Sequence, residues 1–137
     1  MKITICASMK FAKEMMKAKK TLEGNNHVVD IPVGTEKYAV GKLKTENQAE
    51  SLANKLAHNA IREHYNKIVE SDAILVINKD KNGINNYVGG NAFLEIGYAY
   101  VLNKNIFLLN PIPNMIYSTE IEAMKPIILN GDLSKIR

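Results

Sequence analysis

Apolar and polar positions along the chain form blocks that predict strands and helices in turn. Short apolar runs with β-branched residues are typical of strands covered on both faces. Strand-like segments occupy residues 2–7, 27–32, 72–78, 105–110 and 126–129. Segments between them place apolar residues three and four positions apart, which is the spacing of one helix face. This alternation predicts a parallel sheet wrapped by helices, because each parallel crossover needs a helix.

Three helices are expected from these spacings and from their capping residues. Ser8 caps the first helix, and Gly24 ends it. The capping-box sequence TENQ begins at Thr45 and opens the longest helix, whose apolar face continues to Ile68. A third helix is expected over residues 91–103.

Length and composition agree with one globular domain. The chain has 137 residues, of which 46% are hydrophobic and 23% charged, which is an ordinary globular composition. A chain of this size can bury enough surface for a core without a cofactor. The sequence therefore predicts a single α/β domain over residues 1–137, flavodoxin-like or Rossmann-like, with about five parallel strands.

Charge and cysteine content narrow the possible partners. The net charge of +4 suggests a polyanion surface. However, the lysines of the first helix are not interleaved with the aromatic residues that base stacking requires. No apolar run reaches the roughly 18 residues of a membrane span, and no secretion signal precedes the first strand. The single cysteine, Cys6, fits a reducing compartment. We expect a cytoplasmic protein that binds neither membranes nor nucleic-acid polymers.

Polar residues that follow the strands are the candidates for a ligand site. In an open parallel sheet, ligands bind beyond the carboxyl ends of the strands. Ser8, Met9 and Lys10 follow the first strand, Asp80 follows the third, and Asn110 follows the fourth. We therefore expect these side chains to gather at one edge of the sheet.

Four other reactive residues are assigned no catalytic role. Asp72 begins a strand and is expected at the opposite edge. His58 and His64 are six positions apart, on different helix faces, and are interpreted as surface residues. With Cys6 as the only cysteine, no standard zinc set can be assembled from sequence neighbours, and no metal is expected. Cys6 lies within a strand and is not a convincing nucleophile.

A pair of glycines precedes the third helix, and a carboxylate follows about one turn later. Gly89 and Gly90 allow a ligand to approach the backbone, and the first helical N–H groups, from Asn91 onward, attract anions. The helix dipole favours the ionised form of Glu95, which suits a nucleophile better than an acid. The alternative is a glutamate that only complements the dipole. GGNAFLE is neither GxGxxG nor a P-loop, so no dinucleotide or ATP cofactor is expected.

The order of these segments resembles the nucleoside 2-deoxyribosyltransferase superfamily, which includes the 2-deoxynucleoside 5-phosphate N-hydrolases. The resemblance covers nearly the whole chain: a first loop at residues 8–10, the strand DAILVIN, the Asp80 loop and GGNAFLEIGYAYVLNKNIFLLN. Its most specific part is the pattern G-T/N-x-x-E-x-G-x-A, of which the second half is present as Glu95, Gly97 and Ala99, while Gly90 and Asn91 precede Glu95 with one more intervening residue.

This resemblance implies cleavage of the N-glycosidic bond of a nucleoside or nucleoside monophosphate, with transfer to water or a second base. Glu95 would be the nucleophile, and Asp80 would protonate or hydrogen-bond the leaving base. Ser8, Met9 and Lys10 would contact the sugar or its phosphate. The resemblance also implies a homo-oligomer with shared sites.

Two positions depart from the family pattern and leave other functions open. Gly89 stands where members commonly have Ser or Asp, and Thr4 stands where a tyrosine orients the nucleophile. Asn85, Asn86 or Asn91 would then supply the missing contacts. One alternative is a non-catalytic nucleotide-binding or sensing module on the same fold. Another is a phosphoribohydrolase of the cytokinin-activating type. The sequence GGNAFLE partly matches the Gly-Gly-x-Gly-Thr-x-x-Glu loop of that type.

Overall fold

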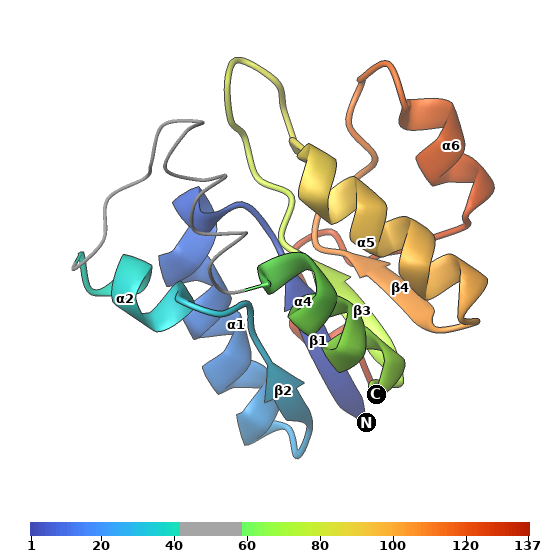
Figure 1. The fold of residues 1–137 in the computed structure, drawn as a ribbon. Helices are drawn as coiled ribbons and strands as arrows, with labels where there is room; N and C mark the ends of the chain where they lie inside the picture. The colour runs from blue at the N-terminus through green and yellow to red at the C-terminus, as the bar shows by residue number, and fades with distance from the viewer. Residues whose placement is uncertain (42–58) are drawn as a thin grey trace.

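The computed structural model of the chain describes residues 1–41 and 59–137. In this part of the chain, five parallel strands form one sheet in the order β2-β1-β3-β4-β5 (Figure 1). The strands are β1 (Lys2–Cys6), β2 (Val28–Asp30), β3 (Ala73–Val76), β4 (Asn105–Leu108) and β5 (Ile127–Ile128). This is the flavodoxin-like order. The predicted α/β fold with five parallel strands is therefore confirmed.

The strand register brings three strand ends to the same edge of the sheet. Cys6, the last residue of β1, is level with Val76 of β3, which is level with Leu108 of β4. The loops after β1 and β3 leave from this edge, whereas both chain ends lie at the other edge (Figure 1). Asp72 lies at that other edge, as predicted, where its Oδ2 accepts a hydrogen bond of 2.8 Å from the Lys2 N–H.

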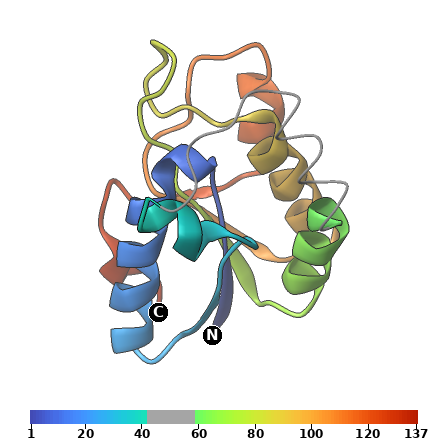
Figure 2. The ribbon, with the colours of Figure 1, turned by 60° about the vertical axis from the view of Figure 1, so that its left-hand side comes forward.

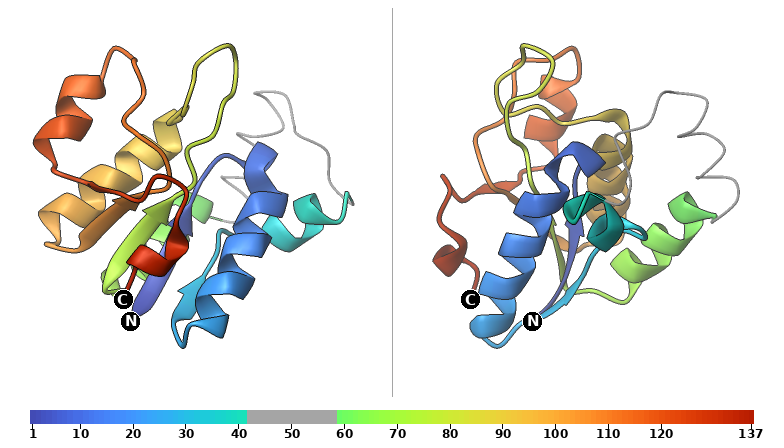
Figure 3. Two further views of the ribbon diagram at one scale, coloured as in Figure 1. Left: turned by 180° about the vertical axis from the view of Figure 1, so that it is seen from behind. Right: turned by 90° about the vertical axis from the view of Figure 1, so that its left-hand side faces the viewer.

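Helices cover both faces of the sheet, and successive residues of β1 point to opposite faces. On one face, α1 (Ala12–Gly24) packs on Ile3 and Ile5. On the other, α4 (Ala60–Val69) and α5 (Gly90–Val101) pack against a cluster that includes Cys6. Figures 2 and 3 show α1 and α4 on opposite sides of the sheet.

The predicted helices agree in position, with differences at their ends. Ser8 caps a short 3-10 helix, η1 (Met9–Phe11), which leads into α1, and α1 ends at Gly24 as predicted. α5 begins one residue before the predicted Asn91. The start of the longest predicted helix, at Thr45, lies outside the described residues, as does His58.

Two short helices were not predicted. They are α2 (Thr35–Ala39) and α6 (Ser118–Ala123), with five and six residues. Helices this short present fewer than two turns, so their periodicity is too brief to recognise. A second 3-10 helix, η2 (Leu133–Lys135), follows the last strand.

None of the helices in the described residues has the length and apolar content needed to cross a bilayer. The assignment of residues 1–137 to a single domain stays a prediction.

Candidate functional site

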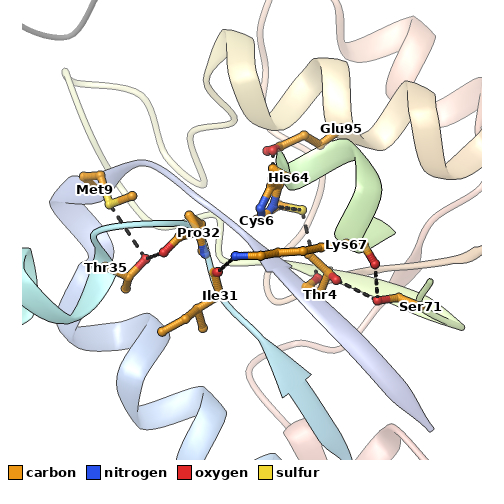
Figure 4. A network of polar contacts seen from close by, with 10 residues as sticks. All are labelled: Thr4, Cys6, Met9, Ile31, Pro32, Thr35, His64, Lys67, Ser71 and Glu95. Carbon is orange, nitrogen blue, oxygen red and sulfur yellow. Dashed lines mark hydrogen bonds and ion pairs between the residues drawn. The ribbon is translucent and has the colours of Figure 1, made fainter. Parts of the chain in front are cut away.

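Three reactive side chains from three different elements meet at the carboxyl edge of the sheet (Figure 4). His64 Nε2 of α4 lies 3.2 Å from Glu95 Oε2 of α5. The same nitrogen lies 3.5 Å from Cys6 Sγ at the end of β1. One polar atom from each residue lies within 4.8 Å of the other two. We call Cys6, His64 and Glu95 the buried triad.

The prediction that His64 is a surface residue is wrong. His64 is only 5% exposed, because it lies four residues before the fully buried Ile68 and therefore on the same face of α4. Glu95 precedes the fully buried Ile96 by one position, which leaves its side chain at the border of the core, 15% exposed. Spacing from Ile68 is the sequence signal that would have placed His64 inside.

His64 is neutral at neutral pH. Burial lowers its pKa to about 4, and the positive charge of Lys67 acts in the same direction, whereas the Ile5 carbonyl and Asp30 raise it. A neutral imidazole carries one N–H. Because Nε2 faces a carboxylate oxygen, we assign the proton to Nε2, which then donates to Glu95. No described residue completes a well-formed hydrogen bond to the buried Nδ1.

Cys6 is a thiol rather than a thiolate. Its pKa is raised well above the ordinary value by burial, then by the negative charge of Glu95 and a hydrogen bond with that carboxylate. A protonated thiol is a poor nucleophile. Cys6 therefore does not supply an attacking group in this environment, and Glu95 lies between two neutral partners.

Thr4 has a structural role in the same core. Its hydroxyl oxygen lies 2.6 Å from the Ser71 hydroxyl oxygen, and both side chains are buried. Ser71 in turn donates to the Lys67 carbonyl, which ties β1 to the end of α4. Thr4 stands where the family tyrosine would orient the nucleophile, but the contact with Glu95 comes from His64. His64 lies on α4, a helix for which the resemblance implies no functional residue.

A pocket of about 600 Å³ opens at the same edge of the sheet. Its described lining consists of Lys10, Phe11, Glu14, Lys79, Asp80, Asn86 and Asn110. Three predicted site residues, Lys10, Asp80 and Asn110, are therefore brought together. Glu95 is not among the described lining residues. We call this space the open pocket.

Asp80 and Ser8 hold the loops that frame the open pocket. Asp80 Oδ1 accepts a hydrogen bond of 2.9 Å from the Asn86 N–H, while the Asp80 side chain stays exposed. Ser8 Oγ accepts a hydrogen bond of 2.8 Å from Lys81 Nζ. Burial, followed by the charge of Lys10, lowers the pKa of Lys81. The two lysines are thus close enough to repel each other.

Asn110 and Asn78 are paired by three hydrogen bonds that run in both directions. The Asn110 N–H donates to Asn78 Oδ1, and Asn110 Nδ2 donates to the Asn78 carbonyl, both at 2.9 Å. Asn78 Nδ2 donates back to the Asn110 carbonyl at 2.8 Å. This pair fixes the ends of β3 and β4 relative to each other. The amide of Asn110 is therefore engaged by the protein, although the residue forms part of the pocket wall.

The glycine pair begins α5, and the Tyr87 ring lies beside it. A Cβ atom added to Gly89 would lie 3.3 Å from that ring, whereas none of the described atoms lies within 4 Å of one added to Gly90. This contact explains why a larger residue does not fit freely at position 89. Asn91 is exposed. The carbonyl of Val88, the residue before the glycine pair, accepts a hydrogen bond from the Tyr117 hydroxyl.

Met9 differs from the other predicted binding residues. It is half-buried against the core on the α1 face, and Thr35 Oγ1 lies 3.9 Å from its sulfur. Its packing therefore accounts for its position in the structure. A substrate contact for Met9 remains a prediction.

Comparison with known proteins finds similarity in the fold. No family model matches the sequence, and no curated protein matches it. Solved structures do. A 2-deoxyribosyltransferase from Bacillus psychrosaccharolyticus matches with a TM-score of 0.55 and 18% identity over 79% of this chain and 71% of the other.

A second solved structure matches over more of the chain. The CMP N-glycosidase BcmB of Clostridium botulinum has a TM-score of 0.50 and 18% identity over 95% of this chain and 90% of its own. The two neighbours are thus named as a 2-deoxyribosyltransferase and a CMP N-glycosidase. The likeness expected from the sequence is confirmed at the level of the fold.

Proposed function

We propose that this protein cleaves the N-glycosidic bond of a nucleoside monophosphate or nucleoside, with Glu95 as the nucleophile. The observation that carries the proposal is the carboxylate of Glu95, held by neutral His64 at the edge where parallel sheets bind ligands. The shared fold supports it, because the two structural neighbours are named as a deoxyribosyltransferase and a CMP N-glycosidase.

The reaction proceeds in two displacements at C1 of the sugar. One oxygen of Glu95 attacks C1 while the C1–N bond breaks, and the bonding electron pair leaves with the base. Asp80 is the candidate to protonate or hydrogen-bond the departing base. Water or a second base then attacks C1 of the glycosyl ester, loses a proton, and releases the Glu95 carboxylate.

His64 acts in this scheme as a positioning residue. Its Nε2–H holds one carboxylate oxygen, which fixes the direction of the other. A neutral donor forms a weaker bond to a carboxylate than a charged one does. Glu95 therefore keeps more nucleophilicity than it would in an ion pair with a protonated histidine.

The lysines around the open pocket favour a 5-phosphate on the substrate. Lys10 and Lys79 line the pocket, and Lys81 Nζ donates a hydrogen bond to Ser8 Oγ. Burial, and then repulsion from the charge of Lys10, lowers the pKa of Lys81. A phosphate dianion between them would remove this repulsion and gain charge-assisted hydrogen bonds.

Chromatography of a substrate panel tests this function. Ribo- and deoxyribonucleosides and their 5-monophosphates are incubated with the protein, with and without a second acceptor base. Free base is the expected product of a hydrolase, and a new nucleoside formed only with acceptor indicates a transferase. If no substrate in the panel is consumed, the proposal is wrong.

A second candidate function is a non-catalytic nucleotide-binding module. The specific observation in its favour is that Glu95 is not among the described residues of the open pocket. In that case a nucleotide should raise the melting temperature by mass action without being consumed. Turnover in the same sample excludes it. The cytokinin-type phosphoribohydrolase, the cytoplasmic location and the homo-oligomer stay predictions from the sequence.

A further inference from the structure

The buried triad has the composition and spacing of a zinc site. Zn²⁺ binds cysteine sulfur at about 2.3 Å and histidine nitrogen or carboxylate oxygen at about 2.0–2.2 Å, usually in tetrahedral geometry. These bond lengths place pairs of ligand atoms roughly 3.3–3.6 Å apart. The nitrogen–oxygen distance in the triad is 3.2 Å, and the nitrogen–sulfur distance is 3.5 Å. These two separations are thus close to what a shared ion requires, and the sulfur and the carboxylate oxygen lie within 4.8 Å of each other.

The triad is held by regular elements rather than by loops. Cys6 ends a central strand and is fully buried, and His64 and Glu95 lie within helices that pack on the same face of the sheet. The nearest lysine along α4, Lys67, donates to the Ile31 carbonyl at 2.8 Å instead of entering the triad (Figure 4). The ligand atoms are therefore pre-positioned.

The state of the His64 ring is a second observation in favour of a ligand. Its Nδ1 is buried, and no described group completes a hydrogen bond to it, which is unusual for a buried polar atom. Coordination through Nε2 would move the ring proton to Nδ1, the usual arrangement of a metal-bound histidine.

We propose that Cys6 Sγ, His64 Nε2 and the Glu95 carboxylate bind a divalent cation of the Zn²⁺ class, and that the bound ion inhibits the glycosidase. A thiolate and an imidazole select Zn²⁺ or Co²⁺ over Mg²⁺ and Ca²⁺. Binding releases one proton from the Cys6 thiol to solvent and changes no oxidation state. Three protein ligands leave the fourth position for water.

Inhibition follows because the ion withdraws electron density from the attacking carboxylate. This second part rests on the proposed function, whereas the binding itself does not. Metal binding and base release must therefore be measured separately.

A cobalt titration tests the site directly. The full-length protein is treated with a chelator, which is then removed, and Co²⁺ is added while the absorption spectrum is recorded. The expected result is a thiolate-to-cobalt charge-transfer band with the visible bands of a four-coordinate ion, both displaced by Zn²⁺ and not by Mg²⁺. Cys6→Ser should lose the charge-transfer band, and Glu95→Gln should weaken binding by at least about tenfold.

Glu63→Gln is the matched control, since Glu63 is exposed on α4 beside His64, and it should bind like the wild type. Absence of the charge-transfer band in the folded wild type overturns the site, as does an unchanged affinity in Glu95→Gln. If circular dichroism shows that Cys6→Ser does not fold, the affinity of Glu95→Gln still tests the site.

The activity part has its own outcome. Stoichiometric Zn²⁺ should stop base release, and a chelator should restore it. Base release that continues with the site saturated overturns the inhibition and leaves the proposed function intact. Cobalt binding in a protein that releases no base from any substrate overturns the proposed function and leaves the metal site intact.

Discussion

The buried triad and the open pocket lie at the same edge of one sheet, yet they control charge in opposite ways. In the triad, burial keeps His64 and Cys6 neutral around Glu95. In the open pocket, the side chains of Lys10, Lys79 and Asp80 stay exposed to water. Burial keeps titratable groups neutral, whereas contact with water leaves charged side chains free to select a ligand. We therefore expect Glu95 of the triad to attack the sugar, Asp80 at the pocket to assist the leaving base, and the pocket lysines to select the substrate.

The largest expected effect is on the triad. Glu95→Gln preserves the size of the side chain and its contact with His64 but removes the nucleophile, so we expect base release to fall by more than about 10³-fold. Glu63→Gln, on the exposed face of α4, should keep the wild-type rate. Unfolding curves of the two variants show whether the loss is chemical. An equal rate in both variants would end the distinction between the two regions.

The next effect is on stability below neutral pH in metal-free protein. Because burial lowers the pKa of His64 from 6.5 to about 4, the unfolded chain binds a proton in this window that the folded protein does not. The free energy of unfolding should therefore fall as pH drops from about 6.5 to about 4, by about 3 kcal/mol from this residue. In His64→Gln this part of the slope should disappear. Urea unfolding at several pH values measures it, and parallel slopes in the two proteins contradict it.

A smaller effect tests the open pocket. Lys10→Gln should raise KM for a nucleoside monophosphate about tenfold and change KM for the free nucleoside little, because one charge-assisted contact to phosphate is lost. Lys13→Gln is the matched control, since Lys13 is exposed in the first turn of α1 and is not among the described residues of the open pocket. Equal changes for both substrates would show that Lys10 does not contact the phosphate.

The smallest effect concerns the glycine pair before α5. Gly89→Ala should lower the free energy of unfolding by up to about 1 kcal/mol, because the new methyl group presses on the Tyr87 ring at 3.3 Å. Gly90→Ala, with nothing described within 4 Å, should be neutral or slightly stabilising. Thermal unfolding of both variants decides this. Equal stability would mean that the Tyr87 ring moves aside freely.

Much of the fold could be predicted from the sequence, because strands and helices leave periodic signals. The five strands were expected within two residues of their observed ends, and α1 and α5 within three residues of theirs. The edge occupied by Asp72 followed from its place at the start of a strand. Among the described residues, the short helices α2, α6 and η2 were not recognised.

The candidate site was less predictable, since it depends on contacts between distant segments. His64 was assigned to the surface because it is six positions from His58 and so on a different helix face, and its contact with Glu95 joins residues 31 positions apart. The pairing of Asn78 with Asn110 likewise depends on the adjacency of β3 and β4. The separation of Glu95 from the described lining of the pocket has no local sequence signal.

The most direct test of the central claim is the mass of the acid-quenched enzyme during turnover of the best panel substrate. The account predicts an increase equal to one sugar or sugar phosphate, located by peptide mapping to Glu95 and absent from Glu95→Gln. Free base accompanied by an adduct on another residue, or by wild-type turnover in Glu95→Gln, would contradict it.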